Sequence, residues 1–235
     1  MPMDSCEFGF KYGVMLVPEI RGCKFLGGSR YKTSEEMQDH LQRMQAGLRA
    51  YIGTLYVIRF DNAKETRSDT IQRFLNSQGT SSEFSSPHVH EELGLVERAW
   101  QTIERTAVAA LRHAPNGCSL DKWFDAMQYG GMTDMKIARA RPRCDDLIIS
   151  NEQRLTGKVP DYSLFIPFFC PVRFFLDPEQ RSNKWDEKAR AGWYIGPSPE
   201  NSTKPYVWDG YAHATAGAGM QICPACLYLR YECLG

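Results

Sequence analysis

The chain has 235 residues, with 28 lysines and arginines balanced by 28 aspartates and glutamates, and 43% of its residues are hydrophobic. A chain of this length can hold one large domain, or a medium and a small one, and can bury roughly 70% of its unfolded surface. The zero net charge excludes an overall field that attracts nucleic acid, so any DNA binding would depend on local basic patches. No run approaches the roughly 18 apolar residues of a membrane span, and no early segment has the layout of a signal peptide, so we expect an intracellular protein without a membrane partner.

The first part of the chain predicts two strands and a helix. Residues 12–17 are an apolar run that indicates a buried strand, and residues 23–31 are suited to be its hairpin partner. Ser34 is placed to cap the helix that follows, and Gly53 is placed to end it. The apolar residues between them recur at three- and four-residue steps, which predicts one buried face.

The next part of the chain predicts a strand, a short helix, a short strand and a long helix. An apolar, β-branched run at residues 55–60 indicates a strand that ends in a turn at Asp61. Ser68 then caps a short helix, and a polar segment with a short strand follows it. Gly94 opens a long helix, and Glu97 flanks the apolar stripe of that helix without belonging to it. This order of elements predicts an α/β fold with a mixed sheet flanked by helices.

The second half of the chain has a different composition. Residues 120–138 show a helical pattern that a Gly-Gly pair interrupts, and a basic run follows at residues 136–143. Beyond Gly157, short aromatic and apolar runs with several prolines predict a small β-rich appendage. After about Asp209 the periodicity is lost, and we expect a poorly ordered tail.

Two acidic residues stand in contexts that would aim them at a common point. Asp61 lies at the carboxyl end of a predicted strand, and Glu97 lies in the first turn of a predicted helix. Carboxylates held on rigid elements offer hard oxygen ligands, which suit Mg²⁺ or Mn²⁺. Taken singly, each residue has a simpler interpretation: Asp61-Asn62 is typical of a turn after a strand, and Glu97 is typical of a solvent-facing helix charge.

Three short motifs follow one another along the chain. The first is Arg59-Phe60-Asp61-Asn62, and the second runs from Pro87 through Gly94 to Glu97. The third comprises Arg154-Leu155-Thr156-Gly157, then Phe168-Phe169-Cys170 and Gly192-Trp193-Tyr194-Ile195-Gly196. In their order and spacing, over roughly residues 10–208, these motifs resemble the integrase core of copia-type retrotransposon polyproteins, which is itself similar to retroviral integrases.

The resemblance implies an RNase H-like core with a metal site made of three acids. The family's first catalytic aspartate precedes the first buried strand, and Asp4 is the only aspartate in that position here. Asp4, Asp61 and Glu97 would then hold Mg²⁺ (or Mn²⁺) for two-metal phosphodiester chemistry in DNA integration. The implied partners are DNA, as element ends and target, and further copies of the chain, and the implied location of an active enzyme is the nucleus.

The same resemblance implies a domain organisation within a Gag-Pol-like polyprotein. Residues 1–115 would form the catalytic core, and residues 116–160 a helical and basic extension. Residues 161–209 would form the small β-rich module, and residues 210–235 the poorly ordered tail. The candidate contacts to the DNA backbone are the basic side chains beside Glu97 and in the extension, although a basic run is equally typical of a solvated face: Arg98, Lys136, Arg139, Arg141 and Arg143.

Three alternatives stay open at this level. The chain could be a decayed or co-opted integrase fragment that keeps the fold and weak DNA binding without turnover. The pair His88 and His90, next to two glutamates, could instead serve a metal hydrolase, although solvated loop histidines have the same pattern. Near the C-terminus a zinc site is chemically possible from Cys223, Cys226, Cys233 and His213, although their spacing matches no standard zinc module.

Overall fold

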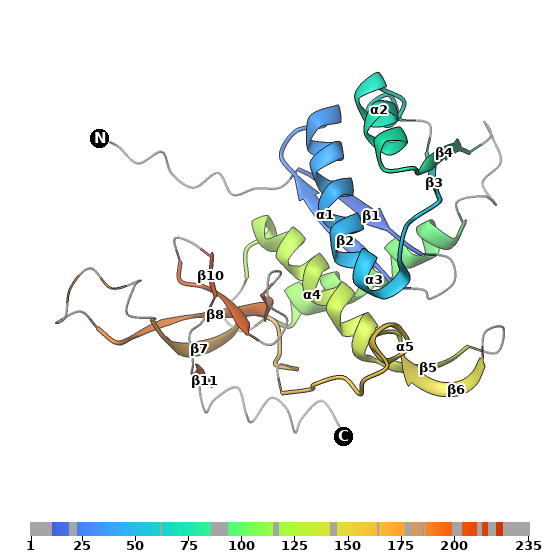
Figure 1. The fold of residues 1–235 in the computed structure, drawn as a ribbon. Coiled ribbons are helices and arrows are strands. Elements are labelled where there is room, and N and C mark those ends of the chain that lie inside the picture. Colours follow the sequence, from blue (N-terminus) through green and yellow to red (C-terminus); the bar gives the residue numbers. More distant parts are fainter. Residues whose placement is uncertain are drawn as a thin grey trace, which may run out of the picture. The chain divides into compact units, whose positions relative to one another are not determined.

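The structure is a computed structural model, drawn as a ribbon in Figure 1. The chain divides into two compact units. One unit comprises Gly9–Ile103 and Asp134–Pro160, and the other comprises Glu104–Thr133 and the chain from Asp161 onward, together with the first eight residues. The structure describes residues 11–18, 23–61, 63–85, 94–114, 118–141, 145–163, 165–176, 181, 183, 185, 187–198, 204–210, 213–215 and 220–222.

The first unit contains two pairs of strands with opposite pairing modes. Strands β1 (Tyr12–Leu16) and β2 (Phe25–Ser29) are antiparallel, which confirms the predicted hairpin. Strands β3 (Val57–Phe60) and β4 (Ser81–Phe84) are parallel, joined through helix α2 (Asp69–Ser77). A parallel pair needs such a crossover, and an antiparallel pair does not, so the order of elements along the chain accounts for both pairings.

Local capping sets the helices of this unit. Helix α1 (Ser34–Ile52) is capped by Thr33, whose hydroxyl accepts a hydrogen bond from the Glu36 amide at 3.3 Å, so the cap lies one residue before the predicted Ser34. Gly53 ends this helix as predicted, with a φ of 73° that favours glycine. Ser68 caps α2 as predicted, because its hydroxyl accepts from the Ile71 amide at 3.4 Å.

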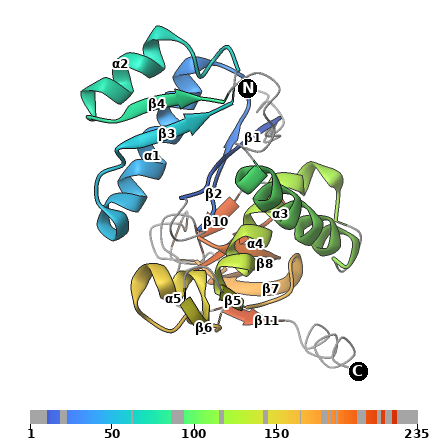
Figure 2. The same cartoon turned by 90° about the vertical axis from the view of Figure 1, so that its right-hand side faces the viewer.

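Helices α1 and α2 lie beside the β3–β4 pair (Figures 1 and 2), and side chains of these elements form the core of the first unit. On β3, buried Ile58 and Phe60 alternate with exposed Val57 and Arg59, which is the period of a half-buried strand. The buried side chains of this core come from α1, α2 and β3: Leu41, Ile58, Phe60, Ile71 and Leu75. Partly buried residues pack around them, among them one from β1 and one from β4: Leu16, Met37, Leu55, Phe74 and Phe84. The two strand pairs therefore share one core.

Helix α3 (Gly94–Arg112) confirms the predicted long helix and packs closely on β1. Ile103 and Ala107 of its predicted stripe are buried. Trp100 lies directly over Gly13 of β1, so that a Cβ atom built at Gly13 would come within 2.6 Å of the Trp100 Cη2 atom. This close approach fixes the first turns of α3 against β1.

Gly13→Ala is expected to destabilise the protein by about 1–3 kcal/mol, because the added methyl group would displace the Trp100 ring. The matched control is Gly47→Ala in α1, where an added Cβ meets nothing within 4 Å and the glycine is exposed in a helix interior. That control should stabilise the protein by about 0.5–1 kcal/mol. Urea denaturation followed by circular dichroism measures both, and a Gly13→Ala variant as stable as the wild type would contradict the tight contact.

The end of helix α4 leads into a hairpin. A short 3₁₀ turn (Leu120–Lys122) precedes α4 (Trp123–Lys136), which runs through Gly130 and Gly131 without a break. The helix predicted over residues 120–138 is thus confirmed, and it continues through the glycine pair that interrupts its apolar pattern. Both glycines are buried, and tertiary packing outweighs their propensity cost of about 1 kcal/mol each. Strands β5 (Ala138–Arg141) and β6 (Asp145–Ser150) pair antiparallel after it, and the short helix α5 (Asn151–Thr156) follows.

The second unit holds an antiparallel sheet of five strands in the order β10-β9-β8-β7-β11. These strands are β7 (Cys170–Phe175), β8 (Ala189–Pro197), β9 (Pro205–Trp208), β10 (His213–Thr215) and β11 (Met220–Ile222). The sheet confirms the predicted C-terminal β-rich appendage. Two of its strands, β10 and β11, lie within residues 210–235, where a poorly ordered tail was expected. These strands form the two edges of the sheet by backbone pairing with their neighbours, and such pairing needs no apolar pattern in the strand itself.

One face of this sheet is buried and the other carries aromatic rings. Phe174 and Tyr194 are among the fully buried side chains, together with Val207. On the other face, Trp193 and Trp208 are cross-strand partners with ring centroids 5.2 Å apart. Within the described part of the chain, no helix has the length and apolar character needed to cross a membrane.

Candidate metal and nucleic-acid site

Asp61 lies where β3 ends, at the carboxyl edge of the parallel β3–β4 pair. The last register pair is Phe60 with Phe84, and the Ser85 amide donates to the Phe60 carbonyl at 3.0 Å, so pairing continues to the residue just before Asp61. The Asp61 side chain is exposed, and its Oδ1 accepts from the Ala63 amide at 3.4 Å. This hydrogen bond is typical of the turn that was expected after the strand. The other carboxylate oxygen of Asp61, Oδ2, has no hydrogen-bond partner among the described residues.

Glu97 lies in the first turn of α3 and is exposed. No described residue forms a hydrogen bond or an ion pair with its carboxylate. The chain leaves β4 at Ser85 and enters α3 at Gly94, so the connection to Glu97 starts from the same edge of the parallel pair at which Asp61 lies. Both residues belong to the same compact unit.

The third predicted acid, Asp4, lies outside the described residues. Among the residues that the structure does describe, no three His, Cys, Asp or Glu side chains are grouped closely enough to hold a metal ion. The donor chemistry of the remaining pair still fits a hard divalent cation, because Asp61 and Glu97 are exposed carboxylates without a cationic partner in the described part of the chain.

The strand before Asp61 is held in register by a charged pair. Arg59 stands opposite Glu83 in the parallel register, and its guanidinium donates to the Glu83 carboxylate at 3.0 Å. Both side chains are about half exposed, so the pair contributes little to stability, of the order of 1 kcal/mol or less. Arg59, the first residue of the motif around Asp61, thus forms an ion pair with Glu83 on the neighbouring strand.

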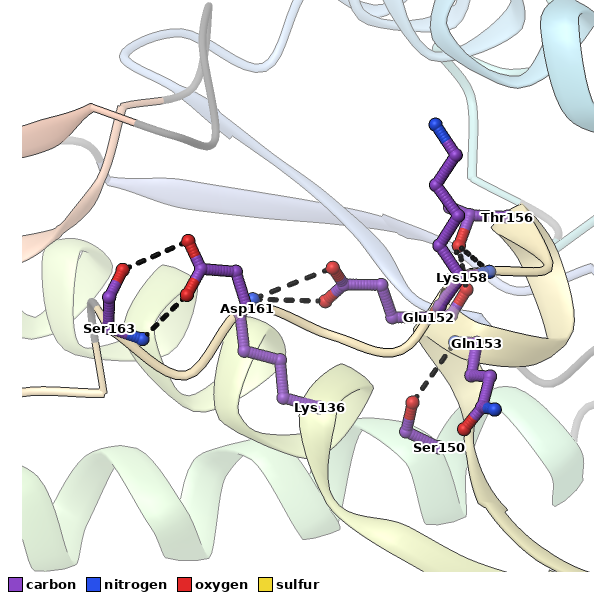
Figure 3. A network of polar contacts seen from close by, with 8 residues as sticks. All are labelled: Lys136, Ser150, Glu152, Gln153, Thr156, Lys158, Asp161 and Ser163. Carbon is purple, nitrogen blue, oxygen red and sulfur yellow. Dashed lines mark hydrogen bonds and ion pairs between the residues drawn. The ribbon is translucent and has the colours of Figure 1, made fainter.

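The predicted basic residues are placed differently from one another. Arg98 is exposed, and its Nε donates to the Gly94 carbonyl of its own helix at 3.0 Å. Lys136 is only 6% exposed, and its ammonium lies 3.2 Å from the Glu152 carboxylate. Figure 3 shows this ion pair. Arg139 and Arg141 lie on β5 and their side chains are outside the described part, as is Arg143 entirely. Lys136 is thus a buried cation paired with Glu152, whereas Arg98 is exposed.

A second buried ion pair lies near the first. The Lys24 ammonium is 2.8 Å from Asp134, and these side chains are 9% and 2% exposed. Asp134 and Lys136 lie at the end of α4, whereas Lys24 precedes β2 and Glu152 belongs to α5. Ser150 caps α5 by accepting from the Gln153 amide at 3.0 Å (Figure 3). The two pairs therefore connect the end of α4 to β2 and to α5.

The alternative metal sites fall mostly outside the described residues. His88 and His90 lie there, and so do Cys223, Cys226 and Cys233. His213 lies on β10, but its side chain is not described. The described cysteines are free thiols: Cys23, Cys118 and Cys170. Burial, together with nearby Asp121, raises the pKa of Cys118 to about 11, so this thiol stays protonated and is a poor metal ligand at neutral pH.

The sequence pattern does not single out the turn that follows Asp61, or the threonine that closes it. Thr66 is 2% exposed and its hydroxyl contacts the Asp61 backbone carbonyl at 3.2 Å. The only sequence signal was the cluster of turn-forming residues after the strand, and that signal does not distinguish a buried threonine from an exposed one.

The chain is similar in fold to several solved structures. No family model matches the chain, and no curated protein does. The chain is similar to a protein of the simian T-cell lymphotropic virus intasome, solved in complex with PP2A regulatory subunit B56 gamma. The TM-score is 0.50 and the sequence identity is 18%, and the match covers 90% of this chain and 73% of that chain. The HTLV-2 integrase catalytic core domain in complex with magnesium matches with a TM-score of 0.47 and 20% identity over 60% of this chain and 82% of that one.

A further match is the catalytic core domain of BIV integrase, with a TM-score of 0.48 and 13% identity, covering 62% of this chain and 85% of that one. At these identities the similarity concerns the fold alone. The intasome protein, which the chain matches over most of its length, confirms the predicted fold class: a mixed α/β, integrase-core fold followed by a β-rich appendage.

Proposed function

We propose that this protein is an integrase-type polynucleotidyl transferase that joins DNA by metal-dependent phosphodiester chemistry. The observation that carries the proposal is the placement of the two acids. Asp61 ends β3 of a parallel pair, and Glu97 opens the helix that follows the partner strand β4, in a fold similar to a retroviral intasome protein. The copia-type resemblance of the motifs around both residues supports the same function.

The chemistry follows from what carboxylates on rigid elements can do. Asp61, Glu97 and, by the resemblance, Asp4 would hold Mg²⁺ or Mn²⁺ through their oxygen atoms. When bound, a pair of such ions would supply charge stabilisation for an in-line displacement at phosphorus. The protein's own contribution is orientation: the end of β3 and the start of α3 are both fixed by packing, Asp61 through β3–β4 pairing and Glu97 through Trp100 on Gly13.

The proposed partners are element-end and target DNA and further copies of this chain. The proposed oligomer rests on the copia-type resemblance of the motifs. Arg98 lies one residue after Glu97 and is exposed, so its guanidinium is suited to contact a phosphate near the acids. Arg139 and Arg141 on β5, together with Arg143, are proposed as further contacts to the DNA backbone, and Lys136 takes a structural role. An active enzyme of this kind would work in the nucleus.

The test is a strand-transfer assay with a labelled duplex end and a plasmid target, run in Mg²⁺ and in Mn²⁺. Asp61→Asn and Glu97→Gln should each lower transfer by at least about 100-fold, because each removes a charge that offsets the cations at the reacting phosphate. Glu104→Gln is the matched control, since it is another exposed acid on the same helix, and it should stay within about twofold of the wild type.

Two other results would point elsewhere. Transfer that is equally strong in the Asp61→Asn variant would overturn the assignment of the site. A folded wild type that binds DNA but transfers no ends in either metal would favour the alternative, a co-opted integrase fold that binds nucleic acid without turnover. DNA binding is read in the same samples by fluorescence anisotropy at two salt concentrations, since contacts to phosphates weaken as salt rises.

A further inference from the structure

The turn after Asp61 is closed by one buried hydroxyl group. Thr66 is 2% exposed, and its Oγ1 donates to the Ala63 carbonyl at 2.7 Å and lies 3.2 Å from the Asp61 carbonyl. The Ala63 amide in turn donates to Asp61 Oδ1 at 3.4 Å. The hydroxyl of Thr66 therefore holds both ends of the short segment that carries the Asp61 carboxylate.

The same turn is anchored to α1 through Glu65. The Glu65 carbonyl accepts from the Ser68 hydroxyl at 2.9 Å and from the Ser34 hydroxyl at 3.4 Å. The Glu65 carboxylate lies 3.2 Å from the ammonium of Lys32 and is 12% exposed. The turn is thus tied to the start of α1 on one side.

Thr66 itself is anchored to the partner strand. Its backbone carbonyl accepts from the Gln72 side-chain amide of α2 at 3.4 Å. The Gln72 side-chain oxygen accepts from the Ser82 hydroxyl of β4 at 2.7 Å. A chain of hydrogen bonds therefore runs from β4 through α2 to the residue that closes the Asp61 turn.

From this network we infer that Thr66 is a positioning residue for Asp61, setting the direction of its carboxylate for a divalent cation. The inference rests on the proposed function, because it assumes that Asp61 is a metal ligand. Groups that orient a ligand through hydrogen bonds affect metal affinity about 10–100-fold when they are removed. Valine at position 66 keeps the shape of threonine, but it leaves the Ala63 and Asp61 carbonyls without the hydroxyl.

The experiment compares Thr66→Val with Thr80→Val by calorimetric titration of Mn²⁺ into the whole protein, with thermal unfolding measured alongside. Thr80 is the matched control: it is 3% exposed, and its hydroxyl donates to the Leu55 carbonyl at 2.7 Å, at the opposite end of β3 from Asp61. Both variants should lose similar stability. Thr66→Val should raise the Kd for Mn²⁺ at least about 10-fold, Thr80→Val should leave it within about twofold, and Thr66→Ser should restore it.

Each outcome decides between the inference and the proposed function. If Asp61→Asn abolishes Mn²⁺ binding but Thr66→Val binds like Thr80→Val, the positioning role is wrong and the proposed function stands. If Asp61→Asn binds Mn²⁺ as the wild type does, or if the wild type binds none, the proposed function fails and the inference fails with it. Should Thr66→Val not fold, Gln72→Leu takes its place, since it removes the anchor of the Thr66 carbonyl; an unchanged Kd in that variant would also overturn the inference.

Discussion

Lys24→Met is expected to lower the free energy of unfolding by about 3–5 kcal/mol. The Lys24 ammonium is 2.8 Å from Asp134, and the side chains are 9% and 2% exposed, so the substitution removes a positive charge from beside a buried carboxylate. The cost arises mainly from desolvation of that remaining charge, because the ion pair as a whole offsets much of its own burial. Urea denaturation followed by circular dichroism measures the change.

A double variant and a control test this explanation. Lys24→Met combined with Asp134→Leu should recover much of the lost stability, since replacement of both partners by apolar residues is often neutral. Arg43→Met removes one partner of the exposed pair with Asp39 in α1 and should cost about 0.5 kcal/mol or less. A Lys24→Met variant within 1 kcal/mol of the wild type would show that Asp134 is not dependent on this cation.

The second large effect is expected in the C-terminal sheet. Phe174 is 1% exposed and packs in the cluster that contains Val172, Tyr194 and Val207. Phe174→Ala should cost about 3–5 kcal/mol, because it removes the ring from the core and leaves a cavity that the sheet closes only in part. The neighbouring Phe175 is 43% exposed on the opposite face of β7, and Phe175→Ala should cost less than about 1 kcal/mol.

Tryptophan fluorescence is a suitable readout for this pair of variants. Trp193 and Trp208 are in contact on adjacent strands of the same sheet, so their emission reports its unfolding. Equal midpoints for Phe174→Ala and Phe175→Ala would mean that β7 does not bury alternate residues as its pattern indicates. A loss confined to Phe174→Ala would confirm that this face of the sheet forms the core of the appendage.

The amino-acid sequence determined the elements whose signals are local. Alternating burial on β3 follows from its alternating side chains, and Ser68 begins α2 because a hydroxyl at that position satisfies a backbone amide. The positions of Asp61 at the end of β3 and of Glu97 in the first turn of α3 follow from the same signals. These features depend on residues close together along the chain, so one sequence suffices to predict them.

Only the tertiary structure decided features that depend on distant partners. Lys136 belongs to a basic run in the sequence, and it is buried because Glu152 lies beside it. The α4 helix continues through two glycines because both are packed, and β10 and β11 form because β9 and β7 offer unpaired edges. Thr66 contacts the Asp61 carbonyl, and its own carbonyl accepts a hydrogen bond from Gln72 of α2, which in turn contacts Ser82 of β4. Each of these features depends on a contact with a segment that is remote along the chain. The local sequence pattern of one segment does not reveal which remote segment it will pack against.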